Sequence, residues 1–201
     1  MDNPVRTAKY LALMQSRRRE LRDRLVLILP ANTHFVWEIG CGHGHFLTAY
    51  ARAHPAELCV GIDLATERIE RANRKRDRAK LGNLQFLQAE ARQFLETLPT
   101  GAVFSRIFIL FPDPWPKLRH HKHRIMQPDF LSTVAQRAAQ DARLYFRTDF
   151  EPYFKDALSV LKDHPNWSAT DEPWLFEHET VFQSRAPSFH SFVAKPRLPR
   201  P

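Results

Sequence analysis

The stretch that decides the fold is His34-Phe-Val-Trp-Glu-Ile-Gly-Cys-Gly-His-Gly-His-Phe46. Residues 34–39 predict a β-strand, and residues 46–53 predict a short helix. Three of the chain's six glycines lie in the turn between them, at Gly40, Gly42 and Gly44. Because glycine allows positive φ and a close approach to the backbone, this turn is predicted to bind a ligand. A tight turn that binds nothing is the alternative.

The alternation of strand and helix continues outward from this turn. Strands are predicted at residues 58–64, 84–88, 106–111 and 143–147, and helices at residues 66–80, 91–98, 128–140 and 153–162. Gly82 is expected to close the helix at residues 66–80, and residues 174–193 are expected to form two closing strands. The pattern predicts a doubly wound α/β sheet whose ligands bind beyond the carboxyl ends of the strands.

Residues 1–30 are expected to form a basic helical extension to the main domain at residues 31–195. The helix is predicted at residues 5–25, and Pro30 stops it. Five arginines crowd into it: Arg17, Arg18, Arg19, Arg22 and Arg24. They are either a solvated face or a contact for nucleic acid. The proline-rich tail at residues 196–201 is expected to fray.

Composition narrows the class of protein. The 201 residues include 30 Lys and Arg against 22 Asp and Glu, and the net charge of +8 suggests a polyanionic partner such as nucleic acid. The two cysteines, Cys41 and Cys59, form no CxxC motif, which excludes a disulfide framework and fits a reducing compartment. No apolar run approaches the roughly 20 residues of a membrane span, and no secretory signal is evident. We expect a cytoplasmic protein without a membrane partner; its oligomeric state is left open.

Acidic residues follow three successive predicted strands. A dinucleotide-binding turn would place its third glycine at position 45, which is His45. The spacing G-x-G-x-G after Glu38 is instead typical of S-adenosylmethionine-dependent methyltransferases, and an acid there suits an ammonium or sulfonium better than a phosphate. Asp63 is placed to accept hydrogen bonds from ribose hydroxyls. Glu90 is placed to accept from an adenine amino group.

A second motif follows the fourth strand: Phe111-Pro-Asp-Pro-Trp-Pro-Lys-Leu-Arg-His-His-Lys-His-Arg124. Its prolines fix φ and hold Asp113 at the mouth of the predicted site. Trp115 either packs locally or stacks on a base. Four cations are expected to serve as a phosphate-binding flank: Lys117, Arg119, Lys122 and Arg124. A metal site built from the three histidines is disfavoured by the dense positive charge and by the lack of a fourth ligand, so no metal is expected.

These motifs resemble those of the bacterial tRNA (guanine-N7-)-methyltransferases. The resemblance rests on EIGCGHG at residues 38–44, the motif at residues 111–124, RTDFEPY at residues 147–153 and ETVFQSR at residues 179–185, in the family's order. It implies a Rossmann-like class I methyltransferase fold: a mostly parallel seven-stranded sheet with helices on both faces and an antiparallel C-terminal strand. It also implies methyl transfer from S-adenosylmethionine to N7 of a guanosine in the tRNA variable loop.

The resemblance carries the family's functional residues onto this chain. The residues implied to bind S-adenosylmethionine are Glu38, Gly40, Gly42, Gly44, Asp63, Glu90, Ala91 and Asp113. Asp113 is also implied to be catalytic. The residues implied to contact the guanosine are Lys117, Asp149, Thr180, Val181, Phe182 and Gln183. The chain departs from the family at Asp63 and Glu90, where the family commonly has Glu and Asp, and at Gln183, which lacks the charge of the family's Glu.

The chemistry of guanine N7 is compatible with these residues. N7 carries an in-plane lone pair and no proton, so positioning and carboxylates that favour the developing positive charge are expected to suffice. Alternatives are a methyltransferase of the same fold acting on a small molecule or a protein, an RNA-binding module without activity, and a nicotinamide-dependent oxidoreductase. The basic loop disfavours a small-molecule or protein substrate. The intact glycine motif with its acids disfavours an inactive RNA-binding module, and His45 disfavours an oxidoreductase.

Overall fold

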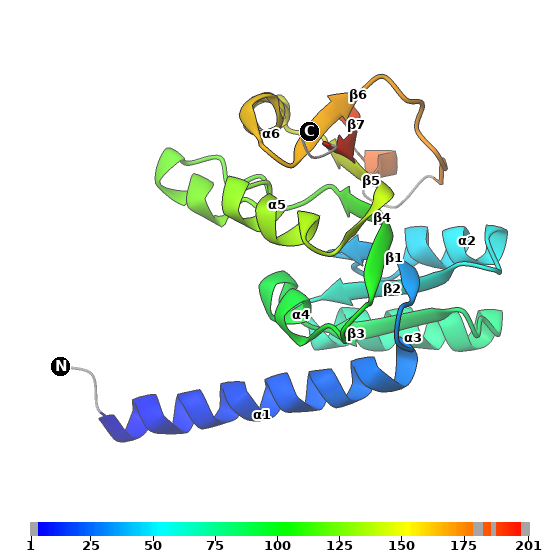
Figure 1. The fold of residues 1–201 in the computed structure, drawn as a ribbon, viewed down its shortest axis with the longest axis vertical. Helices are drawn as coiled ribbons and strands as arrows, with labels where there is room; N and C mark the ends of the chain where they lie inside the picture. Colours follow the sequence, from blue (N-terminus) through cyan, green and yellow to red (C-terminus); the bar gives the residue numbers. More distant parts are fainter. Residues whose placement is uncertain (1–3, 179–182, 186–187, 198–201) are drawn as a thin grey trace.

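The structure is a computed structural model that describes residues 4–178, 183–185 and 188–197 (Figure 1). Within these residues seven strands form one sheet in the order β3-β2-β1-β4-β5-β7-β6. The strands are β1 (His34–Ile39), β2 (Leu58–Asp63), β3 (Leu84–Gln88), β4 (Val103–Leu110), β5 (Ala138–Thr148), β6 (Trp167–Thr170) and β7 (His190–Pro196). The first five strands are parallel, and β7 runs antiparallel to β5 and β6. The predicted fold class is confirmed.

Helices cover both faces of the sheet (Figure 1). They are α1 (Pro4–Ile28), α2 (His45–Ala53), α3 (Thr66–Ala79), α4 (Ala91–Thr97), α5 (Pro128–Ala135) and α6 (Glu151–Asp163), with 3-10 turns η1 (Leu118–His123) and η2 (Gln183–Arg185). Buried residues of α2 and α3 share one core cluster, and those of α1, α4, α5 and α6 share the other. No helix in the described ranges is long and apolar enough to cross a bilayer.

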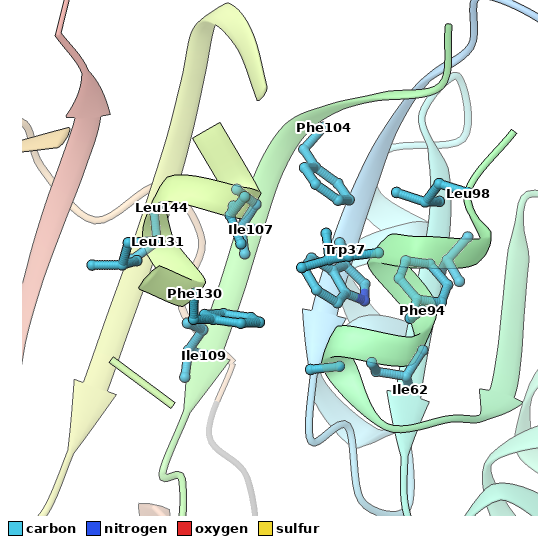
Figure 2. Packing of buried hydrophobic residues seen from close by; sticks show 14 of the residues in the cluster. Trp37, Ile62, Phe94, Leu98, Phe104, Ile107, Ile109, Phe130, Leu131 and Leu144 are labelled. Atoms are coloured by element: carbon cyan, nitrogen blue, oxygen red, sulfur yellow. The ribbon is translucent and has the colours of Figure 1, made fainter. Parts of the chain in front are cut away.

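The larger core cluster fixes the strand that leads into the glycine turn. Trp37 on β1 is fully buried and stacks between Phe94 of α4 and Phe104 of β4, with ring centroids 5.0 and 4.8 Å away (Figure 2). Removing an aromatic side chain of this size from a core costs about 3–5 kcal/mol. The stacking therefore anchors β1 between its neighbours, and the turn that follows it inherits a fixed position.

The C-terminal part of α1 belongs to the same cluster. Leu21, Leu25 and Leu29 are buried there, and α1 lies against α4. Arg18 forms an exposed ion pair with Glu96 of α4, at 2.7 Å. The boundary at residue 30 and the role of the α1 arginines stay predictions. A test by truncation would also remove Leu21 from the core, so substitution of single arginines is the appropriate experiment.

Several boundaries differ from the sequence-based expectation: β4 and β5 begin three and five residues earlier than predicted, and α1 ends three residues later. Three further differences have a visible cause. Helix α5 ends at Ala135 instead of residue 140, because Ala138 already pairs with Phe104 in the sheet. The left-handed residue that closes α3 is Lys80, with φ of 54°, and not Gly82. The two closing strands are Trp167–Thr170 and His190–Pro196, because the segment around Trp174 packs instead on other elements: Trp174 contacts Tyr145 of β5, and Phe176 contacts aromatic side chains of α2. The expected fraying of the tail falls largely outside the described residues.

Candidate functional site

A cavity of about 500 Å³ lies at the carboxyl ends of the parallel strands. Its size falls within the range typical of small-molecule sites, and its place is the one where α/β sheets bind ligands. Segments that follow β1, β2, β3 and β4 all contribute to its wall. The predicted site residues on this wall are Gly40, Asp63, Glu90, Ala91 and Asp113. The fold thus brings together residues that lie up to 73 positions apart in the sequence.

The glycine turn is shaped by backbone contacts to β2. The amides of Gly40 and Cys41 both donate to the Ile62 carbonyl at 2.9 Å. Gly40, Gly42 and Gly44 all adopt positive φ. A Cβ at Gly40 would meet open space, whereas one at Gly44 would lie 2.5 Å from the Phe86 ring. Gly40 therefore leaves room at the cavity, while Gly44 is required by packing of the turn against β3.

Asp63, at the end of β2, ties two of these loops together. Its carboxylate is buried and accepts hydrogen bonds from the amide of Gly42 at 3.0 Å and from that of Ala65 at 2.9 Å. The guanidinium of Arg68 lies 3.6 Å away. Asp63 is thus fixed on the cavity wall before any ligand binds. The sequence predicted the acid but not its contact with the glycine turn, which depends on two loops meeting in space.

Glu38 is a buried carboxyl near the end of β1. Burial raises its pKa to about 8, an effect that the Asp63 charge reinforces and that a backbone hydrogen bond from Leu47 opposes. Its Oε2 atom has no hydrogen-bond partner among the described residues. A buried carboxyl oxygen without a donor is unfavourable. A cationic group that reached Oε2 would therefore supply the missing hydrogen-bond donor.

Glu90 and Ala91 occupy the start of α4. Glu90 is the N-cap residue, and its Oε2 accepts a hydrogen bond from the Gln93 amide at 2.9 Å. The side chain is exposed and lines the cavity next to the buried Ala91. One carboxylate oxygen is thus engaged in capping the helix. The capping role was not predicted, although an acid three residues before Gln93 at a strand-to-helix turn is a recognisable signal.

The proline-rich loop after β4 forms the opposite wall. Phe111 and Trp115 adopt positive φ, of 50° and 43°, which is uncommon for bulky residues and marks a constrained loop. Asp113 is exposed and lines the cavity. The Trp115 ring also lines it and lies 5.7 and 5.1 Å from the rings of His120 and His123. The Trp115 side chain thus contacts two histidine rings of its own loop but is also exposed, so packing and stacking on a base both stay predictions.

Arg124 requires a correction. It was expected to contact RNA phosphates, but its guanidinium is buried and already engaged. It donates to the carbonyls of Pro114 and Trp115, at 2.9 and 3.3 Å, and forms an ion pair with Asp156. It also lies 4.7 Å from the ring centroid of Tyr153. Arg124 therefore supports the proline-rich loop from behind, out of reach of a phosphate.

The remaining cations of the flank are placed as expected for a solvent-facing surface. Lys117, Arg119 and Lys122 are exposed on or beside η1. Nε of Arg119 donates to the ring of His120 at 3.2 Å. Within the described ranges, no three His, Cys, Asp or Glu side chains gather as a metal-ligand cluster. This surface borders the cavity through His123.

Arg147, at the end of β5, is a site-organising residue that sequence reasoning missed. Its guanidinium donates to both carboxylate oxygens of Glu177, at 2.7 and 2.9 Å, and to Oε1 of Gln183 at 3.3 Å. It lies 4.0 Å from the ring centroid of Trp174 and 4.4 Å from that of Phe189. The ion pair lowers the pKa of Glu177. Arg147 is the first residue of the RTDFEPY motif at residues 147–153, but its burial among aromatic rings could not be predicted from the sequence.

Some of the residues expected to contact the guanosine lie near Arg147. Arg147 ties the Glu177 segment and Gln183 to the carboxyl end of β5, close to where Asp149 follows the strand. Asp149 is exposed, as Lys117 is. Thr180, Val181 and Phe182 lie outside the described residues. Gln183 supplies an amide oxygen to Arg147, so its departure from the family's Glu coincides with a structural contact.

Sequence comparisons give the chain a clear set of relatives. A family model described as a putative methyltransferase matches residues 32–188. Three similar curated proteins, each named tRNA (guanine-N(7)-)-methyltransferase, come from Nitrosomonas europaea, Alkalilimnicola ehrlichii and Rhodospirillum rubrum. They are 34, 33 and 30% identical over 67, 75 and 87% of this chain. The chain covers 60, 65 and 73% of their lengths, and thus less than two thirds of the first two.

Solved structures share the fold at lower identity. One reported as an antibiotic-related methyltransferase matches 88% of this chain and 93% of its own, with a TM-score of 0.60 and 22% identity. TrmN from Thermus thermophilus matches 88% of this chain and 48% of its own, with a TM-score of 0.59 and 18% identity. At these identities the likeness concerns the architecture alone.

Proposed function

The chain belongs to the family of the tRNA (guanine-N(7)-)-methyltransferases, and from this premise we propose that it methylates N7 of a guanosine in tRNA, with S-adenosylmethionine as the donor. The observation that carries the proposal is the cavity at the carboxyl edge, whose wall holds Asp63, Glu90 and Asp113. Acids at three strand ends suit a ligand with hydroxyls, an amino group and a cationic centre. The variable loop is the proposed region of the tRNA.

The residues around the cavity fit this cofactor. Glu38 does not itself line the cavity but precedes Ile39, which does, and its buried Oε2 has no donor among the described residues, as a binding partner of an ammonium group would. Asp63 would hold the ribose hydroxyls and Glu90 the adenine amino group, with Ala91 and the glycine turn leaving room for the ligand. Bound there, S-adenosylmethionine supplies an electrophilic methyl group on a sulfonium. The exposed Asp113 would lie between this site and the incoming base.

The chain's own residues have little proton chemistry to perform. Because guanine N7 already carries a lone pair, the protein need only align it with the methyl carbon and favour the positive charge that develops on the purine. Asp113 would supply that negative charge from a loop held by Arg124. Asp149 would accept hydrogen bonds from the guanine N1–H or its 2-amino group. Lys117 and the residues from Thr180 to Gln183 would complete the guanosine contacts.

Methyl transfer to unmodified bulk tRNA, followed by nucleoside mass spectrometry, tests this proposal. We expect a 7-methylguanosine product that D113A reduces about 10²–10³-fold, as expected for loss of one electrostatic group acting on the transition state. Affinity for tRNA should change less than twofold. D141A, which removes an exposed aspartate from β5 away from the cavity wall, is the matched control and should retain wild-type activity.

The other outcomes assign the function differently. A methyl group on another tRNA nucleoside would be consistent with the proposed cofactor and with tRNA as the substrate, but it would overturn the proposed specificity for N7 of guanosine. Cofactor binding without any label in tRNA would favour a small molecule or a protein as the substrate. Equal losses of tRNA binding and methyl transfer in D113A would contradict a catalytic role for Asp113.

A further inference from the structure

Helix α3 carries a row of cations along one face. Arg68, Arg71, Lys75 and Arg78 follow one another at steps of three, four and three residues, which places them on one side of the helix. Arg74 lies beside this row. Ile69 and Ala72 are buried and attach the adjoining side of the helix to the core. We call these five basic residues the α3 cation row.

The charges of this row are poorly compensated. In the part of the chain that the structure describes, Arg68 lies 3.6 Å from Asp63 and Arg74 lies 4.0 Å from Glu70, whereas Arg71 and Arg78 form no ion pair. Like charges three or four residues apart on a helix repel each other. The row is therefore kept at some cost to the stability of the unbound protein.

The positive charges of the α3 cation row help to lower the pKa values of neighbouring titratable groups. The pKa of His43, in the glycine turn, is lowered by burial and then by the charges of Arg71, Arg68 and Lys75. The pKa of Lys75 is lowered by burial and then by Arg78. Lys75 also donates to the His43 carbonyl at 2.9 Å, which joins the row to the glycine turn. The positive field thus extends from the helix to the rim of the site.

The row begins at the cavity that the proposed function uses. Arg68 lines this cavity together with Trp115 and His123 of the proline-rich loop. The exposed cations Lys117, Arg119 and Lys122 lie on that loop's side, on and beside η1. The cavity is therefore flanked by two basic surfaces that come from different parts of the chain. A polyanion lying across the cavity would contact both.

We propose that the α3 cation row is a second binding surface for the phosphate backbone of the tRNA substrate, so that the tRNA spans the cavity between this row and the η1 flank. The proposal rests on the proposed function, since tRNA is the polyanion that must reach this cavity. A solvated helix face is the ordinary role of charged residues. It accounts neither for two arginines without a carboxylate partner nor for the continuity of the row with the site.

The test compares two double variants with the same change in net charge. R71Q/R78Q removes the two unpaired arginines of the row. R52Q/K162Q removes exposed cations from the last turns of α2 and α6, the ends that point away from the carboxyl edge. The affinity of each full-length variant for unmodified tRNA is measured between 50 and 200 mM salt. Affinity for S-adenosylhomocysteine is measured in parallel.

Each phosphate contact contributes about 0.7–0.9 to the slope of log K against log salt. R71Q/R78Q is therefore expected to lower this slope by about 1.4–1.8 and to weaken tRNA binding about tenfold at 0.1 M salt. R52Q/K162Q should leave the slope at the wild-type value, and neither variant should change the affinity for S-adenosylhomocysteine. Thermal unfolding at low salt should show R71Q/R78Q to be at least as stable as the wild type, since repulsion is removed.

The outcomes separate this inference from the function it rests on. A wild-type slope in R71Q/R78Q, with the wild type still forming 7-methylguanosine, overturns the inference and leaves the function intact. Equal slope losses in both double variants would show a nonspecific charge effect and also overturn it. If the row binds polyglutamate as well as it binds tRNA, an acidic protein replaces the RNA as its partner. Wild-type protein that neither binds nor methylates tRNA overturns both proposals.

Discussion

At the residue scale, Glu38 is a buried carboxyl whose protonation state a bound cation would change. Its pKa is raised to about 8 by burial, so at pH 7 the free protein holds a proton on this carboxyl. Between pH 4.5 and 8 the folded chain keeps this proton while the unfolded chain has lost it. This group's contribution to stability is therefore full below about pH 4.5 and lost as the pH rises to about 8.

A cation bound beside Glu38 reverses this preference, because it favours the ionised carboxylate. We expect binding of S-adenosylmethionine at pH 7 to release a proton from the wild-type protein and to tighten as the pH rises toward 8. Calorimetric titrations in two buffers of different protonation enthalpy measure this release. E38Q has no proton to lose and should show none. Wild-type binding with the same heat in both buffers would contradict the assignment.

Arg119 and Arg124 lie in the same motif but in opposite environments, so their substitutions should separate binding from support. R119Q removes an exposed cation and should lower the salt slope of tRNA binding by about 0.7–0.9. R124Q removes buried hydrogen bonds to Pro114 and Trp115, and should destabilise the fold by about 1.5–3 kcal/mol while leaving the slope unchanged. Chemical denaturation and tRNA titration give both quantities. A reduced slope at wild-type stability in R124Q would restore its predicted phosphate contact.

At the scale of the elements, the glycines of the turn look alike in sequence but differ in the space around them. G44A combines a positive φ, which costs about 1–2 kcal/mol, with a methyl group pressed against Phe86, which adds about 1–3 kcal/mol. G42A has a positive φ but meets open space, so it should lose only about 1–2 kcal/mol. Urea denaturation of the two variants measures the difference. Equal losses would show that packing against Phe86 does not require the glycine.

Sequence patterns predicted most of the elements but not where tertiary pairing overrides local signals. The bounds of β1 and β3 were predicted to the residue, since both are short runs between clear turn signals. Helix α5 was predicted five residues too long, because the pattern does not reveal that β5 starts at Ala138 to pair with Phe104. The segment around Trp174 has strand-like composition, but Trp174 packs on Tyr145 of β5 and Phe176 packs on α2. Long-range contacts decide both cases.

The site was predicted at the level of residue types and not of contacts. Of the acids predicted near the ends of three successive strands, Asp63 and Glu90 line one cavity together with Asp113 of the proline-rich loop, whereas Glu38 is not among its lining residues. Whether they bind the cofactor stays a prediction. The opposite roles of Arg119 and Arg124, and the position of Arg147 between two aromatic rings, depend on burial. Burial of a cation cannot be inferred from its neighbours in sequence.

At the scale of the whole molecule, stability and recognition occupy different regions. Two apolar clusters hold the helices onto the faces of the sheet, while the cavity is built from segments at the carboxyl ends of the strands. The two regions meet where core residues such as Ile62, Ala91 and Ile109 also line the cavity. Glu38 is a further buried residue of β1, and its Oε2 finds no donor within the described part of the chain. The ligand that satisfies it would also complete the interior of the protein.

This coupling gives a prediction for the whole fold. A ligand that binds only the folded chain, at a hundredfold excess over its Kd, stabilises it by about 2.7 kcal/mol. We expect S-adenosylhomocysteine to raise the melting temperature and to slow digestion by a nonspecific protease. E38Q should bind the ligand more weakly and therefore gain less at the same ligand concentration. If E38Q binds the ligand as tightly as the wild type and gains the same stability at each concentration, Glu38 takes no part in this coupling.

The Oε2 atom of Glu38, which has no hydrogen-bond partner among the described residues, has a consequence for the lifetime of the protein in a cell. Degradation in cells largely follows the population of opened molecules. A chain completed by its methyl donor would persist while the donor is plentiful and be turned over when the donor is scarce. The steady-state amount of the protein would then rise and fall with the concentration of its ligand.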